Sequence, residues 1–286
     1  MNQEAMDLIC HRLTDNSIAF SSRIVTNGYL LTNDVVDKAL SLWNLDKVQI
    51  TIDGTKEVYN RVKAIDSSDD AYTRVINNIS YLLSKNVQVR IRLNLDTYNA
   101  RDMITLVSNL INQFQSCPTL KIYTELLFEK AGDKERMRSH ADRSQLYQTS
   151  ETINSMLASA GLGLNASLPR TYKHYQCMAD SGKAVVIAPD GHLGLCEHFT
   201  DSEFFGSVLS DETNQDMIRS WQEHMRLPEC ASCPLSPDCI RVKKCVENAI
   251  CPEERRSYRI NELKKCMEKE YENYLKQKER EVTSEN

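Results

Sequence analysis

In the first half of the chain, short apolar β-branched runs alternate with longer segments whose apolar residues recur at helical spacing. The run FSSRIVTNGYLLT breaks at Thr26-Asn27-Gly28, which predicts a strand that leaves through a glycine turn. Residues 34–43 then place apolar side chains at helical spacing, and Thr32 or Asn33 can cap the first turn. The pattern therefore predicts a strand followed by an amphipathic helix.

Three more strand–helix pairs follow. Strands are predicted at 47–54, 87–96 and 120–128, and the helices after them at 70–85, 99–115 and 146–160. This alternation predicts parallel strands joined by right-handed crossovers. The fold class is therefore α/β, either as a fragment of an α/β barrel or as an open doubly wound sheet. In both, functional residues are expected at the carboxyl ends of the strands.

The pattern changes in the second half of the chain. The charged stretch at 129–146 predicts a surface loop that leads into a helix. The segment AVVIAPDGHLGLCEHF predicts a hairpin around Pro189-Asp190-Gly191. From residue 253 onward the chain is charged with a sparse apolar stripe, which predicts a solvated terminal helix that frays at its end. We therefore predict a first domain at 1–168 and a second at 169–286.

Composition narrows the class of protein. A net charge of −5 over 286 residues does not favour a nucleic-acid surface. No apolar run approaches the roughly 18 residues that span a bilayer, and the amino-terminal segment lacks a signal-peptide pattern. We therefore expect a cytoplasmic protein with no nucleic-acid and no membrane partner. In that reducing compartment, clustered cysteines are metal ligands more often than disulfides.

Cysteines are concentrated in the predicted second domain. Of the ten in the chain, eight lie there: Cys177, Cys196, Cys230, Cys233, Cys239, Cys245, Cys251 and Cys266. The x2 spacing of Cys230 and Cys233 allows one tight turn to direct two thiolates at the same metal, and Cys239 follows a proline-containing loop. Cys177 and Cys196 flank the predicted hairpin and form a second pair. The spacing fits zinc and iron–sulfur sites equally well, with disulfides third.

The remaining two cysteines, Cys10 and Cys117, are isolated in the sequence. We interpret them as ordinary buried or surface thiols.

The order C-x13-G-x4-C, then C-x2-C-x5-C-x5-C, closely resembles the SPASM domain. This is the C-terminal module of radical S-adenosylmethionine (SAM) enzymes that often mature peptides or sulfatases, and it holds two auxiliary four-iron four-sulfur (4Fe-4S) clusters. The family's middle motif usually ends in C-x3-C, so the x5 spacing of Cys239 and Cys245 is a departure. The runs RIVTNGYLLT, VQITIDGTKEVYNRV and VRIRLNLD resemble the third, fourth and fifth strands of the radical SAM partial barrel. Together the two resemblances cover nearly the whole chain.

The resemblance implies an enzyme that modifies a peptide or protein by radical chemistry. It implies a cluster near the barrel, with an unidentified fourth ligand, held by Cys177, Cys196 and Cys245. It implies an outer cluster held by Cys230, Cys233, Cys239 and Cys251, with Cys266 as the substitute for Cys251. Because such clusters transfer single electrons, a reductant such as flavodoxin or ferredoxin is an expected partner beside the substrate.

The resemblance also implies roles for residues at the strand ends. Thr51, Asp53 and Asn94 are placed to reach the ribose or amino acid part of SAM, and Arg61 to pair with its carboxylate. The alternative for each is a turn-forming or surface role.

Glu197 follows Cys196 directly. At this place some members of the family, such as the anaerobic sulfatase-maturing enzymes, carry an aspartate proposed to deprotonate the substrate. A solvated carboxylate at a strand end is the alternative for Glu197, and His198 is equally open.

The family's C-x3-C-x2-C motif, whose three thiolates leave one iron open for SAM, does not occur in the sequence, and neither does the GGEP turn. We expect either a truncated enzyme, which we favour, or a natural partial protein that works with another chain. SAM and a third 4Fe-4S cluster are expected only with the missing segment. Two other functions stay open: a non-catalytic iron–sulfur electron-transfer or peptide-binding subunit, and a zinc-stabilised structural protein.

Overall fold

Two compact units make up the chain in a computed structural model. The structure describes residues 3–63, 69–96, 98–115, 117–127, 140–164, 177–197, 201–223, 228–236, 239 and 253–284. Unit 1 comprises Met1–Leu127 and Arg138–Asn165, and unit 2 comprises Phe128–Met137 and Ala166–Asn286. Each unit is described by itself below.

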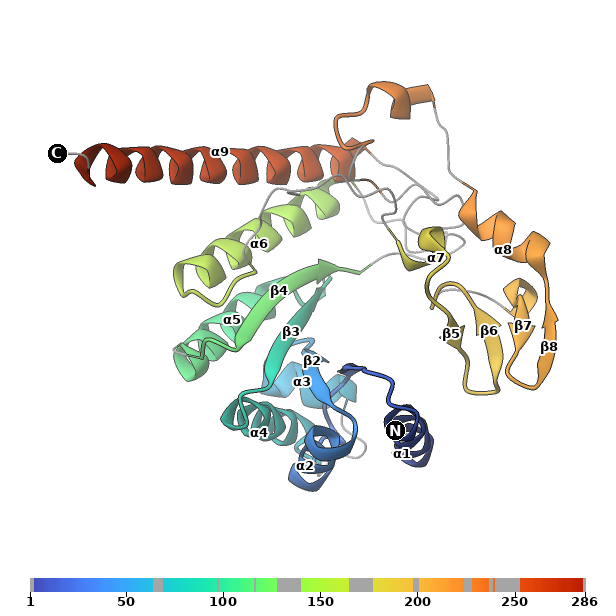
Figure 1. The fold of residues 1–286 in the computed structure, drawn as a ribbon. Helices are drawn as coiled ribbons and strands as arrows, with labels where there is room; N and C mark the ends of the chain where they lie inside the picture. The colour runs from blue at the N-terminus through green and yellow to red at the C-terminus, as the bar shows by residue number, and fades with distance from the viewer. Residues whose placement is uncertain are drawn as a thin grey trace. The chain divides into compact units, whose positions relative to one another are not determined.

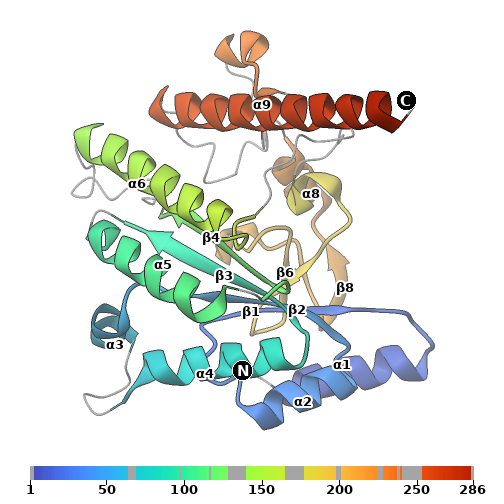
Figure 2. The ribbon, with the colours of Figure 1, turned by 90° about the vertical axis from the view of Figure 1, so that its left-hand side faces the viewer.

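Unit 1 is built on a parallel sheet with strand order β1-β2-β3-β4 (Figures 1 and 2). The strands are β1 (Ser22–Thr26), β2 (Leu45–Thr51), β3 (Gln88–Leu95) and β4 (Leu120–Leu126). The helices are α1 (Gln3–Asp15), α2 (Asn33–Leu42), α3 (Lys56–Lys63), α4 (Ala71–Ser84), α5 (Ala100–Phe114) and α6 (His140–Ser159). The four predicted strand–helix pairs are confirmed. Helix α3 was not predicted, and α6 begins before residue 146.

One face of this sheet packs against the helices. Along β3, the side chains of Val89, Ile91, Leu93 and Leu95 are buried in the same apolar core as residues of α2, α4 and α5. Figures 1 and 2 show α4, α5 and α6 on one side of β3 and β4. Sequential strand order with the helices on one face is the winding of a β/α barrel, whereas a doubly wound sheet carries helices on both faces. Of the two predicted architectures, the strand order and the side on which the helices pack agree with barrel winding.

The chain returns to the sheet after α6, where no strand was predicted. The backbone N–H of Ile122 donates to the carbonyl of Leu162 at 2.8 Å, and Ile122 forms an isolated parallel bridge with Gly163. Leu162 thus lies beside β4 at the position that a fifth strand would take. The alternation of strands and helices continues one step further than the sequence pattern indicated.

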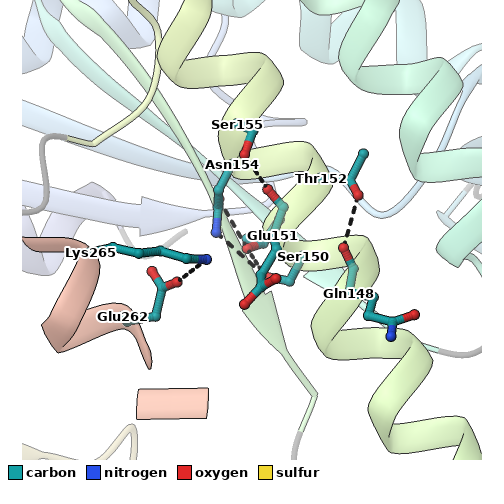
Figure 3. Close-up of polar contacts among 9 residues, drawn as sticks. Gln148, Ser150, Glu151, Thr152, Asn154, Ser155, Glu262 and Lys265 are labelled. Carbon is teal, nitrogen blue, oxygen red and sulfur yellow. Dashed lines mark hydrogen bonds and ion pairs between the residues drawn. The ribbon is translucent and has the colours of Figure 1, made fainter. Parts of the chain in front are cut away.

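Polar side chains attach α6 to β4. The hydroxyl oxygens of Thr124 and Ser150 lie 2.7 Å apart, and the Thr124 hydroxyl also donates to Asn154 Oδ1 at 3.3 Å. Figure 3 shows Ser150 and Asn154 on the same side of α6. The hydroxyls of Thr152 and Ser155 instead donate to carbonyls of the preceding helical turn. Ser150 and Asn154 therefore fix α6 to the sheet, whereas the hydroxyls of Thr152 and Ser155 bond only within the helix.

Unit 2 contains a small antiparallel sheet with strand order β5-β6-β7-β8. Its elements are α7 (Met178–Ser181), β5 (Val186–Ile187), β6 (His192–Gly194), β7 (Gly206–Ser207), β8 (Ser210–Thr213), α8 (Gln215–Gln222) and α9 (Glu253–Ser284), with short 3-10 helices at Asp201–Glu203 and Pro228–Ser232. The predicted hairpin is confirmed: Gly191 has a φ of +89° in its turn, and Asp190 Oδ1 accepts from the backbone N–H of His192. The predicted terminal helix is confirmed as α9. Glu262 and Lys265, both on this helix, form an exposed ion pair (Figure 3).

None of the helices in the described part of the chain is both long enough and apolar enough to cross a membrane.

Candidate functional site

The carboxyl ends of β2 and β3 are joined by the side chain of Asn99. Its Nδ2 donates to the carbonyl of Asp53 at 3.1 Å and to that of Asn94 at 2.9 Å. Its Oδ1 accepts from the backbone N–H of Asp96 at 2.8 Å. Since Asp53 follows β2 and Asn94 lies in β3, one amide fixes the distance between the two strand ends. Two of the predicted cofactor-binding residues are thereby brought to one site.

Two buried acceptors at this site have no hydrogen-bond partner among the described residues. These are Asp53 Oδ1 and Asn94 Oδ1. The other carboxylate oxygen of Asp53 lies 3.2 Å from Lys63 Nζ, and the Asp53 side chain is only 17% exposed. A buried oxygen without a partner costs free energy, so a ligand that donates a hydrogen bond to it is favoured. The strand ends therefore present acceptors suited to hydroxyl or amine donors.

The turn after β2 is fixed by a carboxylate from α5. Asp102 accepts from the backbone N–H of Thr55 at 2.6 Å and from its hydroxyl at 2.7 Å. A Cβ at Gly54 would lie 2.6 Å from Val58 Cγ1 and 2.7 Å from Asp102 Oδ2. Only glycine fits between these groups, which explains the Asp-Gly pair in physical terms.

The other two predicted cofactor residues differ in their placement. Thr51 is the last residue of β2, pairs in register with Arg92 of β3 and is partly exposed. Arg61 is exposed on α3, and it is Lys63 of the same helix that contacts Asp53. Thr51 thus lies at the sheet edge with Asp53 and Asn94, whereas no described contact joins Arg61 to these residues.

A tyrosine packs beneath the strand ends. Tyr59 is 2% exposed, and its hydroxyl donates to the carbonyl of Asn27 at 3.4 Å. Burial, with a smaller contribution from the charge of Asp53, raises the pKa of Tyr59 to about 12. The phenol therefore stays protonated and links the turn after β1 to α3.

The turn after β1 is built from the predicted Thr-Asn-Gly sequence. Thr26 Oγ1 accepts from the backbone N–H of Gly28, and Asn27 Oδ1 accepts from that of Tyr29, both at 3.1 Å. Gly28 has a φ of +79°, and the buried Asn78 donates to its carbonyl at 2.8 Å. These bonds hold the end of β1 level with the other strand ends.

In unit 2, Cys177 and Cys196 pack against one small apolar core. Its buried members are Ala179, Leu195, Phe205 and Trp221. Cys177 precedes α7 and Cys196 follows β6, so the β5–β6 hairpin brings the chain back to the apolar core beside Cys177. The two cysteines of the second predicted ligand pair therefore contact the same apolar core.

Cys230 and Cys233 lie on one tight turn. The backbone N–H of Cys233 donates to the carbonyl of Cys230 at 3.3 Å, and that of Ser236 donates to the carbonyl of Cys233 at 3.0 Å. Both side chains are partly exposed, as are those of Cys239 and Cys266. This local geometry is the one expected for two ligands separated by two residues.

The full ligand sets are not tested by these contacts. Within the described residues, no three or more His, Cys, Asp or Glu side chains gather closely enough to hold a metal ion. Cys245 and Cys251, which the sequence assigns to the two sets, lie outside those residues. Cys266 lies on α9. The cysteine assignments therefore stay predictions.

Glu197, the predicted proton acceptor, is exposed directly after Cys196. His198 lies outside the described residues. This exposure fits a proton acceptor that is accessible to substrate, and it equally fits a solvated carboxylate. The role of Glu197 therefore stays a prediction.

Sequence reasoning missed Asn99, Lys63 and Asp102. Asn99 follows the predicted strand in LNLDTYN, where an asparagine after a strand is a turn signal and gives no sign of a bond to the neighbouring strand. Lys63 and Asp102 lie on helices and resemble ordinary surface charges. Only the three-dimensional arrangement distinguishes them.

Comparisons with known proteins add solved structures of similar fold. No model of a known protein family matches the chain, and no curated protein matches it. A structure of anSMEcpe with bound AdoMet matches with a TM-score of 0.62 and 14% identity, over 96% of this chain and 77% of that one. A structure of anSMEcpe with AdoMet and Kp18Cys peptide matches with a TM-score of 0.60 and 15% identity, over 93% and 79% of the two chains.

A third similar structure is that of Streptococcus suis SuiB bound to S-adenosylmethionine. It matches with a TM-score of 0.54 and 12% identity, over 82% of this chain and 57% of that one. At these identities the likeness shows the fold alone: the chain shares the α/β architecture of anSMEcpe and SuiB. The fold class predicted from the strand motifs is confirmed.

Proposed function

We propose that the chain is a radical SAM/SPASM-type enzyme, or the carboxyl-terminal portion of one, that modifies a peptide or protein substrate. The observation that carries this proposal is the likeness to AdoMet-bound anSMEcpe over 96% of this chain, a span that takes in the cysteine-rich unit 2. The peptides bound to anSMEcpe and to SuiB support a peptide as substrate. A cytoplasmic location and a reductant such as flavodoxin or ferredoxin are parts of the same proposal.

The strand ends of unit 1 fit SAM. Asp53 Oδ1 and Asn94 Oδ1 are buried acceptors that lack a partner among the described residues, and SAM carries donors in its ribose hydroxyls and its amino group. We assign them to these donors, with Thr51 beside them at the end of β2. When bound and reductively cleaved, SAM supplies the chemistry that removes a hydrogen atom from the substrate. The residues named here hold and orient it.

The thiolates of unit 2 are the donor type that 4Fe-4S clusters require. Cys177 and Cys196 pack against one apolar core, and Cys230 and Cys233 lie on one turn. We assign Cys177, Cys196 and Cys245 to the first cluster. We assign Cys230, Cys233, Cys239 and Cys251 to the second, with Cys266 as the substitute for Cys251. Such clusters supply one-electron transfer, tuned by thiolate ligation and burial. Glu197, next to Cys196, is the residue that we assign to accept a proton from the substrate.

A second candidate function is a non-catalytic iron–sulfur subunit for electron transfer or peptide binding. The observation that favours it is the lack of a C-x3-C-x2-C motif in the sequence, since Cys10 and Cys117 are the only cysteines before Cys177. A cluster ligated by four thiolates has no open iron for SAM. Under either proposal, the chain should not cleave SAM without that motif.

Binding of SAM to the reconstituted chain, supplied with a segment that carries the C-x3-C-x2-C motif, tests the first proposal. We expect Asn94→Ala to weaken SAM binding about threefold or more, because one acceptor is lost. We expect the free energy of unfolding to be unchanged or higher, because the variant also removes a buried oxygen without a partner. Equilibrium dialysis with labelled SAM and urea unfolding measure the two effects. Unchanged SAM affinity in Asn94→Ala, measured with that segment present, would argue against this site.

A further inference from the structure

The sheet face of unit 1 that faces away from the helices carries arginines. The residues of β3 that alternate with its buried positions are Gln88, Arg90, Arg92 and Asn94. The register of the sheet places Gln49 of β2 beside Arg90, and Tyr123 of β4 beside Arg92. Arg23 of β1 reaches the same face, because its guanidinium donates to Gln49 Oε1 at 2.7 Å. We refer to Arg23, Arg90 and Arg92 as the arginine cluster.

The three arginines act on a common neighbour. Burial raises the pKa of Tyr123, while the positive charges of Arg92, Arg23 and Arg90 lower it and Glu125 raises it. One phenol on β4 therefore lies within electrostatic reach of guanidinium groups on β1 and β3. The arginine cluster is a local concentration of positive charge around Tyr123.

This charge is not neutralised by the described part of the chain. None of the ion pairs found among the described residues involves Arg23, Arg90 or Arg92. Among the residues of β1 to β4 on the same sheet face as the arginine cluster, Glu125 is the one carboxylate. The Nε of Arg92 is buried and lacks a hydrogen-bond partner among the described residues. A buried guanidinium N–H without an acceptor is costly, which favours a ligand that supplies one.

We infer that the arginine cluster binds an acidic segment of the peptide substrate. This inference rests on the proposed function and adds the chemical class of the substrate to it. A guanidinium binds a carboxylate through two parallel hydrogen bonds, which a surface lysine does not do. SAM also carries a carboxylate, but it carries one, whereas the cluster has three guanidinium groups and a single acidic neighbour. A peptide with several Asp or Glu side chains matches that excess of positive charge.

Fluorescence anisotropy with the full, anaerobically reconstituted chain tests this inference. The probes are a short fluorescein-labelled peptide that alternates Glu with Ala, and the same peptide with Gln in place of Glu. We expect the Glu peptide to bind roughly tenfold more tightly or better, because only it accepts charge-assisted hydrogen bonds. Equal affinity for the two peptides overturns the inference.

Variants show whether the arginine cluster is responsible. We expect Arg90→Gln/Arg92→Gln to lose the preference for the Glu peptide. The control Arg12→Gln/Arg101→Gln removes the same amount of charge from exposed positions of α1 and α5. We expect this control to retain the preference for the Glu peptide. Should the first pair disturb folding, Arg90→Lys/Arg92→Lys keeps the charge and removes the forked geometry, and we expect a partial loss. Equal losses in the cluster and control pairs overturn the inference.

Three further measurements separate the alternatives. Displacement of the Glu peptide by SAM, with loss of SAM binding in Arg90→Gln/Arg92→Gln, assigns the cluster to the cofactor and overturns the inference. Tighter binding of a single-stranded DNA oligonucleotide assigns it to nucleic acid and also overturns it. Iron is measured on the same samples: a chain that binds iron but no acidic peptide refutes only this inference, and one that binds the peptide but no iron refutes only the proposed function.

Discussion

Replacing Asn99 with alanine removes the side chain that joins the ends of β2 and β3. The parent amide makes three hydrogen bonds, to the carbonyls of Asp53 and Asn94 and from the N–H of Asp96. All three partners are backbone groups at the strand ends, and each bond contributes about 0.5–1.5 kcal/mol. We therefore expect Asn99→Ala to lower the free energy of unfolding of unit 1 by about 2–4 kcal/mol. Asn99 precedes α5 without a side-chain capping bond, so a lost cap adds nothing to this value.

The chain offers a probe for each unit. It contains two tryptophans, Trp43 in unit 1 and Trp221 in unit 2, and both are buried. In a Trp221→Phe background, the fluorescence of Trp43 during urea unfolding reports on unit 1 alone. Asn109 is exposed on α5, so Asn109→Ala is the matched control, and we expect it to change stability by less than about 0.5 kcal/mol.

A second substitution separates the donors of Asn99 from its acceptor. Asn99→Asp keeps an oxygen for the N–H of Asp96 but removes the two donated bonds and adds a negative charge near Asp53. We expect a loss of stability at neutral pH in this variant also. A loss below about 0.5 kcal/mol in Asn99→Ala would refute the reasoning, because three bonds to backbone groups would then contribute no more than an exposed side chain.

Four further predictions follow from the fold and the cysteines. Gly28→Ala should destabilise unit 1 by about 1 kcal/mol or more, because φ is +79° and a Cβ would lie 3.0 Å from Ile50 Cγ2; no change in the urea midpoint would contradict this. Unit 1 should lose stability between pH 10 and about 12, because the unfolded chain releases the Tyr59 proton first, and Tyr59→Phe should flatten that part of the profile. Cys233→Ala should remove about half of the iron, and loss of all of it would indicate a single coupled centre. The reconstituted chain alone should release no 5′-deoxyadenosine from SAM with dithionite, and several turnovers would indicate an open iron.

The strands and helices of unit 1 were predictable because their physical cause is local. On β3, alternate residues from Val89 to Leu95 are apolar. In the structure these residues form the buried face of the strand, and the polar residues between them form the other face. The choice between a barrel fragment and a doubly wound sheet was not local. It depends on the side of the sheet on which each helix packs, and an amphipathic pattern is the same for both sides.

The candidate site was predictable in its residue types and less so in its geometry. Asp53 and Asn94 follow from the rule that parallel strands place their carboxyl ends together. Their connection through Asn99 and the contact of Lys63 with Asp53 depend on side chains that approach from helices and turns. The role of Arg61 was implied by the resemblance; Arg61 is exposed on α3, and its pairing with the carboxylate of SAM stays a prediction.

The metal content of the anaerobically reconstituted chain tests the central claim most directly. If unit 2 holds two clusters, we expect about eight irons and as many acid-labile sulfides per chain, with a broad absorption near 400 nm. The assay is elemental analysis for iron and zinc together with sulfide determination on the same sample. A colourless protein that binds one or two zinc ions and no sulfide would contradict the account and favour a zinc-stabilised structural role for the cysteines.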